Sequence, residues 1–177
     1  MERITAPPAR VLLTQAGLLP APAPGAQAVI LVTQILHDDS KGSGAAAAFK
    51  VTIADLNPTM IAKAEERIAR NAGWEGRVDA VVADAQATKL PDAHFTHAIM
   101  NFGLQFMPDK IAALKETLRI LKPGGVLGMT VWTSPGWLDS LIKGCPGWTT
   151  PPALVNPLGR PGIVEMLAAA GLPPSEG

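Results

Sequence analysis

The sequence predicts an α/β fold in which a doubly wound parallel sheet of about five strands carries helices on both faces. Three observations indicate this fold. Short apolar runs typical of buried strands alternate along the chain with segments that carry apolar residues at helical spacing. The connection over residues 33–49 is long enough for the crossover that parallel pairing requires. The 177 residues, 47% of them hydrophobic, suffice for one core, and no repeat or second domain is evident.

The first half of the chain is expected to supply two neighbouring strands. Residues 9–17 have the spacing of a short amphipathic helix, and the proline-rich tract over residues 19–25 forces an extended connection after it. The apolar run AVILV over residues 28–32 is predicted to be the first strand, buried on both faces. A second buried strand is expected over residues 51–54, and it ends at Asp55.

The second half is expected to alternate helices with strands. Asn57 and Pro58 are a favoured cap and first helical residue, so a helix is predicted to follow the second strand and to end at Gly73. Asp109 is predicted to cap another helix, which Lys122-Pro123-Gly124-Gly125 ends. The remaining elements are expected as strands over residues 78–82, 96–100 and 126–132, and as helices over residues 137–143 and 161–170.

Charge and composition exclude several classes of function. The 15 basic residues balance the 15 acidic ones, so a nucleic-acid partner is not expected. The single cysteine, Cys145, fits a reducing compartment. A signal-peptide pattern is absent and no apolar run approaches about 18 residues, so a cytoplasmic protein without a membrane partner is expected. His37, His94 and His97 form no cluster at ligand spacing, so no metal site is expected.

Polar groups stand where three of the predicted strands end. In an open parallel sheet, ligands bind beyond the carboxyl ends of the strands. Asp55 could there accept the two hydroxyls of a ribose, or it could simply begin a turn. Asp84 and the Ala85 backbone could meet an adenine, or Asp84 could be a solvated loop carboxylate. Asn101-Phe102-Gly103 could approach a ligand closely, or Phe102 could be a core residue.

Three segments resemble the class I S-adenosylmethionine-dependent methyltransferases of the small-molecule type. The run VTIADLNPTMIAKAEERI is similar to their second-strand motif, and VVADAQATKLPDAHFTHAIMNFGLQFMPD is similar to the third and fourth. The run LRILKPGGVLGMTVW resembles the helix, turn and fifth strand, and is the most specific match. The resemblance covers residues 9–170. It implies a Rossmann-like sheet with strand order 3-2-1-4-5.

The resemblance implies S-adenosyl-L-methionine as the cofactor and methyl transfer to a small molecule as the reaction. It assigns no catalytic residue, because a nucleophilic acceptor needs no dedicated base. One domain is expected over residues 1–177: an N-terminal helix and proline-rich lead-in over 1–25, a cofactor-binding core over 26–132, and a C-terminal helical segment over 133–177. The implied cofactor contacts are Asp55 for the ribose, Leu56 beside the adenine, Asp84 and Ala85 at the adenine edge, and Asn101 and Phe102 at the methionine end.

The sequence departs from the family pattern in two places. The family has an acidic residue and a glycine-rich turn after its first strand, whereas here Leu31 is followed directly by Val32-Thr33. The family also closes its sheet with two further strands, which are not expected here. The sequence therefore predicts a truncated class I methyltransferase fold with one bare sheet edge and without the first glycine-rich motif.

Three functions follow as hypotheses. The first is an active small-molecule methyltransferase. The second is a catalytically impaired methyltransferase-like protein, a pseudoenzyme or truncated gene product, that lacks the methionine side of the cofactor site. The third is a nicotinamide-dependent oxidoreductase, because Asp55 after a second strand also suits NAD. This third hypothesis is the weakest, since the sequence contains no G-x-G-x-x-G.

Overall fold

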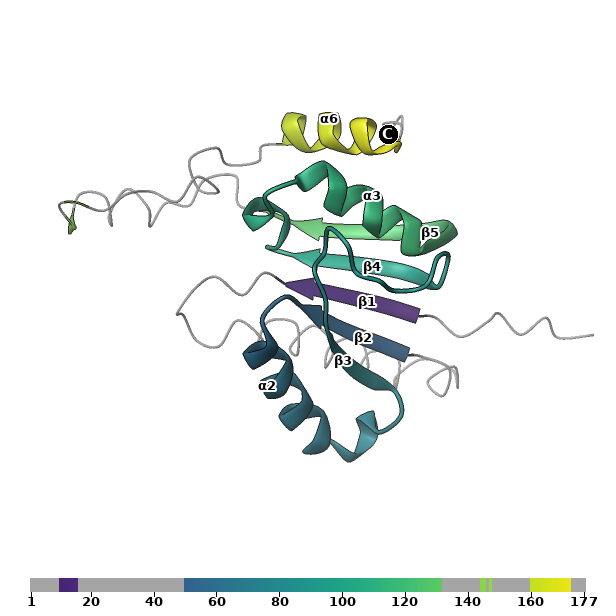
Figure 1. The fold of residues 1–177 in the computed structure, drawn as a ribbon. Coiled ribbons are helices and arrows are strands. Elements are labelled where there is room, and N and C mark those ends of the chain that lie inside the picture. Colours follow the sequence, from purple (N-terminus) through teal and green to yellow (C-terminus); the bar gives the residue numbers. More distant parts are fainter. Residues whose placement is uncertain (1–9, 16–49, 132–143, 146, 148–159, 173–177) are drawn as a thin grey trace, which may run out of the picture.

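The computed structural model describes residues 10–15, 50–131, 144–145, 147 and 160–172. Five strands form one sheet in the order β3-β2-β1-β4-β5, and each neighbouring pair is parallel (Figure 1). The predicted fold class and strand order are therefore confirmed.

The strands are β1 (Arg10–Gln15), β2 (Lys50–Asp55), β3 (Val78–Val82), β4 (Phe95–Asn101) and β5 (Leu121–Thr130). The helices are α2 (Pro58–Ala69), α3 (Lys110–Ile120) and α6 (Arg160–Ala170), with short 3₁₀ turns at η2 (Ala72–Trp74) and η3 (Leu104–Phe106). Among the described residues, no helix is long and apolar enough to cross a membrane.

The first strand of the sheet is not the one that the sequence predicted. The central strand is β1, within the segment expected to be a helix over residues 9–17, and it pairs with both β2 and β4. The helix prediction is wrong because a run as short as Val11-Leu12-Leu13 fits either period, and two parallel neighbours satisfy its backbone. The strand expected over residues 28–32, like the helix expected over 137–143, lies outside the described residues.

This correction changes the meaning of the missing glycine turn. The sequence places this turn after Leu31 because it predicts residues 28–32 as the first strand. The first strand ends instead at Gln15, and Gly17 lies two positions later in the sequence. The sequence Leu31-Val32 therefore does not follow the first strand, and the prediction that the motif is missing loses its basis. The sheet also includes Arg10–Gln15, within the segment 1–25 for which the sequence predicts an N-terminal helix and a proline-rich lead-in.

The two central helices begin as the sequence predicted. The Asn57 side chain accepts a hydrogen bond from the backbone N–H of Thr59 at 2.9 Å, and Pro58 is the first residue of α2. The Asp109 side chain accepts from Ala112 N at 2.8 Å at the start of α3. Helix α2 ends at Ala69 rather than at Gly73, because η2 follows it.

Helices α2 and α3 cover opposite faces of the sheet. Ile53 and Ile99 pack with α2 residues, whereas Ala98 and Met100 belong to clusters that contain α3 residues. Neighbouring residues of a strand point to opposite faces, so the two helices lie on different sides, as a doubly wound sheet requires. Helix α6 packs on α3 and extends the core on that side through Ala170 (Figure 1).

The turn before the fifth strand is part of the strand itself. Helix α3 ends at Ile120, and β5 begins at Leu121, so the Lys-Pro-Gly-Gly run lies inside the strand rather than before it. The pairing of β4 with β5 shifts register between Phe95 and His97, which accommodates this run as a bulge. Gly124 adopts a φ of +77°, which glycine tolerates without strain.

Candidate functional site

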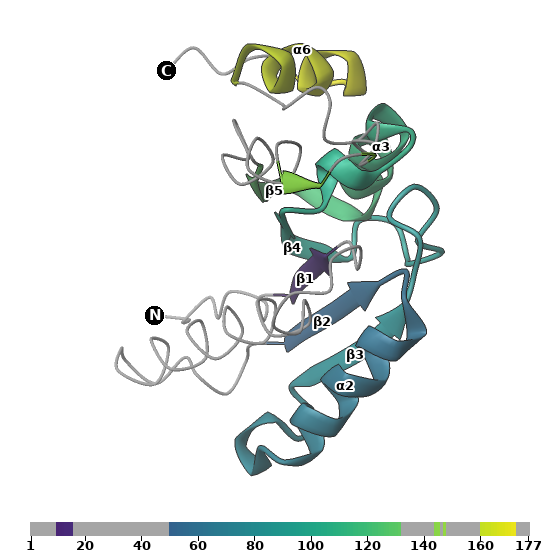
Figure 2. The same cartoon turned by 90° about the vertical axis from the view of Figure 1, so that its left-hand side faces the viewer.

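The carboxyl ends of the strands form one edge of the sheet. Asp55 at the end of β2 is in register with Gln15 of β1 and with Val82 of β3. On the other side of β1, Asn101 at the end of β4 is in register with Thr130 of β5. The side view in Figure 2 shows the parallel strand arrows that define this edge. The three predicted groups of site residues therefore follow the ends of three strands of one sheet.

Asp55 is a buried carboxylate with few partners. The residue is 5% exposed, and its Oδ1 accepts a 2.8 Å hydrogen bond from Asn57 N, the single donor to this carboxylate among the described residues. Burial raises the pKa of Asp55 above its ordinary value, although the Asn57 hydrogen bond opposes the shift. The backbone oxygen of Asp55 accepts from Ala83 N at 3.0 Å, which joins the ends of β2 and β3. Among the described residues, the carboxylate therefore has acceptor positions that no donor fills.

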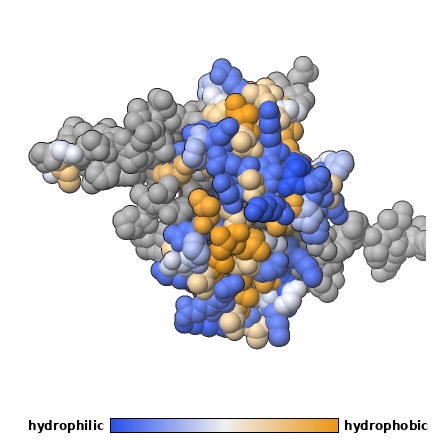
Figure 3. All heavy atoms as spheres, in the orientation of Figure 1, coloured by the Kyte–Doolittle hydropathy of each residue, from blue (hydrophilic) through white to orange (hydrophobic). Residues whose placement is uncertain are grey.

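Exposed apolar side chains stand beside Asp55 in sequence and in register. Leu56 is 63% exposed and Val82 is 55% exposed, so two large apolar side chains are accessible at neighbouring strand ends. Figure 3 shows apolar surface gathered between the regions of α2 and α3 on this face of the molecule. Leu56 therefore has the accessibility that an apolar wall of a ligand site requires.

Asp84 and Ala85 follow β3 in a turn that the Asp84 side chain closes. Asp84 Oδ1 accepts from Gln86 N at 2.9 Å and from Gln86 Nε2 at 3.2 Å. The Asp84 backbone oxygen accepts from Ala87 N at 3.0 Å. Asp84 and Ala85 are both half-buried, so they are partly accessible at the edge of the sheet.

Asn101 and Phe102 are fixed by the neighbouring strand. Thr130 Oγ1 donates to Asn101 Oδ1 at 2.7 Å, and Phe102 N donates to the Thr130 backbone oxygen at 3.0 Å. Phe102 has a φ of +49°, a left-handed conformation that is uncommon for a bulky residue. Strained backbone of this kind persists where surrounding contacts hold it, and it is concentrated at functional sites.

Three polar residues that the sequence reasoning did not single out support this edge. Thr130 holds Asn101, Gln86 holds Asp84, and Glu116 of α3 accepts hydrogen bonds from Thr88 in the loop after Asp84. Thr130 is 29 residues from Asn101 and Glu116 is 28 residues from Thr88, so no local pattern could have identified these two, whereas Gln86 lies only two positions after Asp84.

The sequence profile of a family described as methyltransferase domain matches residues 40–129, which is half of the chain. The chain belongs to the methyltransferase domain family. Its fold is that of the class I S-adenosylmethionine-dependent methyltransferases. The matched residues of this methyltransferase domain include β2, β3 and β4 and all six residues proposed for the site.

Named relatives of the chain include two kinds of methyltransferase. The methyltransferase domain is 35% identical over 108 residues to "Methyltransferase tpcH" of Aspergillus fumigatus, over 59% of this chain and 38% of that protein. It is 41% identical over 86 residues to the ubiquinone/menaquinone biosynthesis C-methyltransferase UbiE of Shewanella woodyi, over 49% of this chain and 34% of that one. The chain thus spans well under half the length of these relatives.

Solved structures share the fold at low sequence identity. The trans-methyltransferase CalH, solved as a complex with SAH, has a TM-score of 0.67 and 18% identity, over 93% of this chain and 45% of that one. The [4+2]-cyclase SpnF has a TM-score of 0.65 and 23% identity, over 93% of this chain and 51% of that one. A cyclase with this fold illustrates that the fold alone does not decide the reaction.

Proposed function

We propose that the chain binds S-adenosyl-L-methionine and is the cofactor-binding part of a methyltransferase that acts on a small molecule. The observation that carries the proposal is Asp55: a buried carboxylate at the end of β2, with Asn57 N as its one donor among the described residues, beside an exposed leucine and in register with the end of β3. An ionised carboxylate can accept hydrogen bonds from two hydroxyl groups, and a ribose presents two hydroxyl groups side by side.

The residues present fit the cofactor. Asp55 would hold the ribose hydroxyls and Leu56 would pack beside the adenine. Asp84 would accept from the adenine amino group through the oxygen that Gln86 contacts only at 3.5 Å, with Ala85 at the ring edge. Asn101 and Phe102 would line the methionine end. When bound, the cofactor supplies a methyl group on a sulfonium to a nucleophile of the substrate, while these residues position it and exclude water.

The small-molecule substrate is supported by two observations. The UbiE relative, 41% identical over 86 residues, is named for ubiquinone/menaquinone biosynthesis. The chain carries equal numbers of basic and acidic residues, which does not favour a nucleic-acid substrate. A cytoplasmic location belongs to the same proposal and is supported by the exposed thiol of Cys145, which suits a reducing compartment.

Calorimetric titration of the chain with S-adenosylmethionine and with NAD tests the cofactor. We expect binding of S-adenosylmethionine and none of NAD. Asp55→Asn should weaken the binding, whereas Asp79→Asn is the matched control, because Asp79 is an exposed carboxylate on β3 that accepts from Thr52 instead. Failure to bind S-adenosylmethionine, or equal loss in both variants, would contradict the proposed site.

A transfer assay tests the reaction. The chain is incubated with methyl-labelled S-adenosylmethionine and, separately, with a small-molecule extract, RNA and protein. Label is expected in the small-molecule fraction. Label in RNA or protein would overturn the substrate class, and cofactor binding without any transfer would favour the catalytically impaired alternative.

A further inference from the structure

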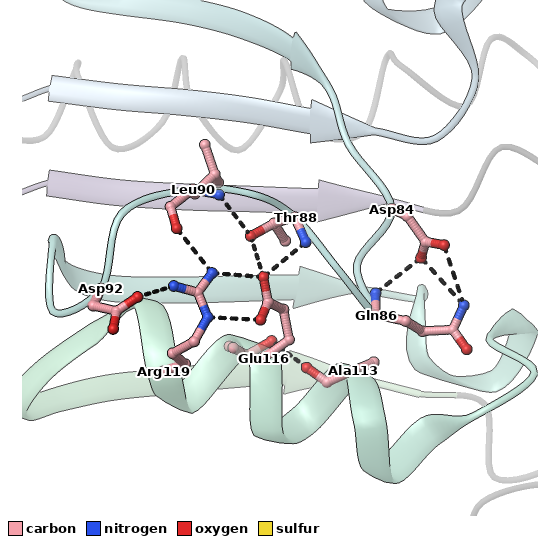
Figure 4. A network of polar contacts seen from close by, with 9 residues as sticks. Asp84, Gln86, Thr88, Leu90, Asp92, Ala113, Glu116 and Arg119 are labelled. Atoms are coloured by element: carbon pink, nitrogen blue, oxygen red, sulfur yellow. Dashed lines mark hydrogen bonds and ion pairs between the residues drawn. The ribbon is translucent and has the colours of Figure 1, made fainter.

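The connection between β3 and β4, residues 83–94, contains no helix, and side chains of α3 hold it in place (Figure 4). This loop carries Asp84 and Ala85. Its backbone includes two non-glycine residues with positive φ, Lys89 at 59° and Ala93 at 46°. A loop with strained backbone and no regular hydrogen bonding keeps one shape only where other contacts fix it.

Glu116 is the centre of the first attachment. Its Oε1 accepts from Thr88 N at 2.7 Å and from Thr88 Oγ1 at 2.5 Å. Thr88 is 8% exposed and the Glu116 side chain is 12% exposed, so water competes little for these hydrogen bonds. Hydrogen bonds from Arg119, and then from Thr88, lower the pKa of Glu116 to about 2, so its carboxylate is charged at neutral pH.

Arg119 extends this attachment along the loop. It donates to both oxygens of Glu116, at 2.8 Å from Nε and 2.7 Å from Nη2. It also donates to the Leu90 backbone oxygen at 2.8 Å and to the Asp92 carboxylate. Two side chains one turn apart on α3 therefore hold alternate loop residues from Thr88 to Asp92, as Figure 4 shows.

Gln86 provides the second attachment, at the other end of α3. Its Oε1 accepts from Asp109 N at 2.9 Å, directly at the cap of the helix. Its Nε2 and backbone N both donate to Asp84 Oδ1, so the orientation of the Asp84 carboxylate depends on the position of α3. Asp84 lies between these attachments and the end of β3.

We propose that Gln86 and Glu116 are positioning residues for the adenine edge of the site: they fix the loop so that the Asp84 carboxylate faces an amino donor. This inference rests on the proposed function, because it assumes that an adenosine group occupies the edge. Neither residue touches the ligand in this proposal. Both act through Asp84, and their effect should therefore be specific to the group that Asp84 recognises.

The readout is the discrimination between adenosine and inosine, since inosine carries a carbonyl oxygen where adenosine has its amino group. The wild-type chain should bind adenosine more tightly than inosine by about tenfold, the scale of one hydrogen bond to a charged group. Glu116→Ala and Gln86→Ala should reduce this ratio several-fold. Glu116→Gln keeps an acceptor for Thr88 and should retain more of the ratio than Glu116→Ala does.

Glu66→Ala is the matched control, because it removes an exposed glutamate that pairs with Arg70 on α2, away from the loop. It should leave the ratio unchanged. A general loss of stability would weaken adenosine and inosine equally and leave the ratio intact. If Glu116→Ala does not fold, Gln86→Ala decides the question by the same ratio.

The outcomes separate the two proposals. If the wild-type chain binds neither adenosine nor S-adenosylmethionine, the proposed function fails, and the inference fails with it. If the wild-type chain discriminates adenosine from inosine and the folded variants discriminate equally well, the inference alone is overturned.

Discussion

The hydroxyl of Thr130, at the end of β5, donates a 2.7 Å hydrogen bond to Oδ1 of Asn101, at the end of β4. The Phe102 N–H donates back to Thr130 Oγ1 at 3.0 Å. The ends of β4 and β5 are therefore joined by side-chain hydrogen bonds as well as by the backbone hydrogen bonds between the strands. This relationship determines where Asn101 and Phe102 stand at the proposed methionine end of the site.

Thr130→Val should weaken binding at the proposed methionine end of the site and leave binding at the adenosine end unchanged. The valine has the same shape but no hydroxyl, so Asn101 and the strained Phe102 lose a contact that holds them. S-adenosylmethionine affinity should fall about tenfold while adenosine affinity stays unchanged. Calorimetric titration with both ligands measures the two affinities. Thr130→Ser keeps the hydroxyl and is the control, and an equal fall for both ligands would argue against the assignment.

Asp55→Asn should lower the affinity for the ligand and raise the stability of the ligand-free protein. The amide still accepts from Asn57 N but is uncharged, so the affinity for S-adenosylmethionine should fall by more than about 1 kcal/mol. Because the folded pKa of Asp55 lies above its ordinary value, the ionised carboxylate destabilises the fold at pH 7, and this penalty disappears as the pH falls below the folded pKa.

The ligand-free Asp55→Asn variant should accordingly have a higher free energy of unfolding than the wild type at pH 7, with the difference shrinking in acid. Chemical denaturation at several pH values measures this. A variant that is less stable than the wild type at pH 7 would show that the Asp55 carboxylate has stabilising partners in the free protein.

Glu116→Gln should flatten the acid dependence of stability. The folded pKa of Glu116 is lowered to about 2 from 4.5, so its ionised form stabilises the fold fully above the ordinary value. That contribution is lost as the pH falls from 4.5 towards about 2. At pH 7 the variant should be less stable by about 1–3 kcal/mol, and its stability should vary less with pH over the acid range.

The control for Glu116→Gln is Glu66→Gln, which alters an exposed pair and should change the free energy of unfolding by less than about 0.5 kcal/mol. Urea unfolding between neutral and acid pH provides the comparison. An acid dependence that is the same in Glu116→Gln as in the wild type would mean that another carboxylate is responsible for it.

Gly125→Ala should destabilise the bulge at the start of β5. A Cβ at this position would lie 2.8 Å from the backbone oxygen of Lys122 and 3.2 Å from that of Thr96, and neither backbone atom can move cheaply. The free energy of unfolding should fall by about 1–3 kcal/mol. At Gly73 an added Cβ meets nothing within 4 Å, so Gly73→Ala should be nearly neutral by thermal unfolding. Similar effects at both positions would disprove the steric reason.

The sequence predicted most of the elements because their signals are local. A few consecutive residues suffice to identify the caps at Asn57 and Asp109 and the apolar run over residues 78–82. The structure has a helix or a strand at each of these places. The first strand was misplaced because Val11-Leu12-Leu13 and the run over residues 28–32 are both short and apolar. Choosing between them requires knowing which one pairs with β2, and that contact is not local.

The same distinction applies to the site. Asp55, Asp84 and Asn101 could be nominated because each directly follows a run of strand character. Thr130 and Glu116, which support these residues from far along the chain, could not be nominated. Glu116, for example, contacts Thr88 only once α3 has packed on the sheet. The helical spacing of Ile111, Leu114 and Leu118 puts all three on one apolar face of α3, yet Ile111 is 36% exposed whereas Ala113 is fully buried. Packing against α6 and the loop decides that face, and spacing alone does not.

The central place of β1 has a consequence for cooperativity. This strand of six residues hydrogen-bonds to β2 on one side and to β4 on the other, so it joins two half-sheets. The halves also share apolar clusters, because Ile99 of β4 packs with α2 residues and Ala54 of β2 clusters with Ile120 of α3. A ligand that reaches from Asp55 to Asn101 would cross over β1 and bridge the halves a second time. Because the halves share β1 and these clusters, they should unfold in one transition, and a bound ligand should raise the temperature of that transition.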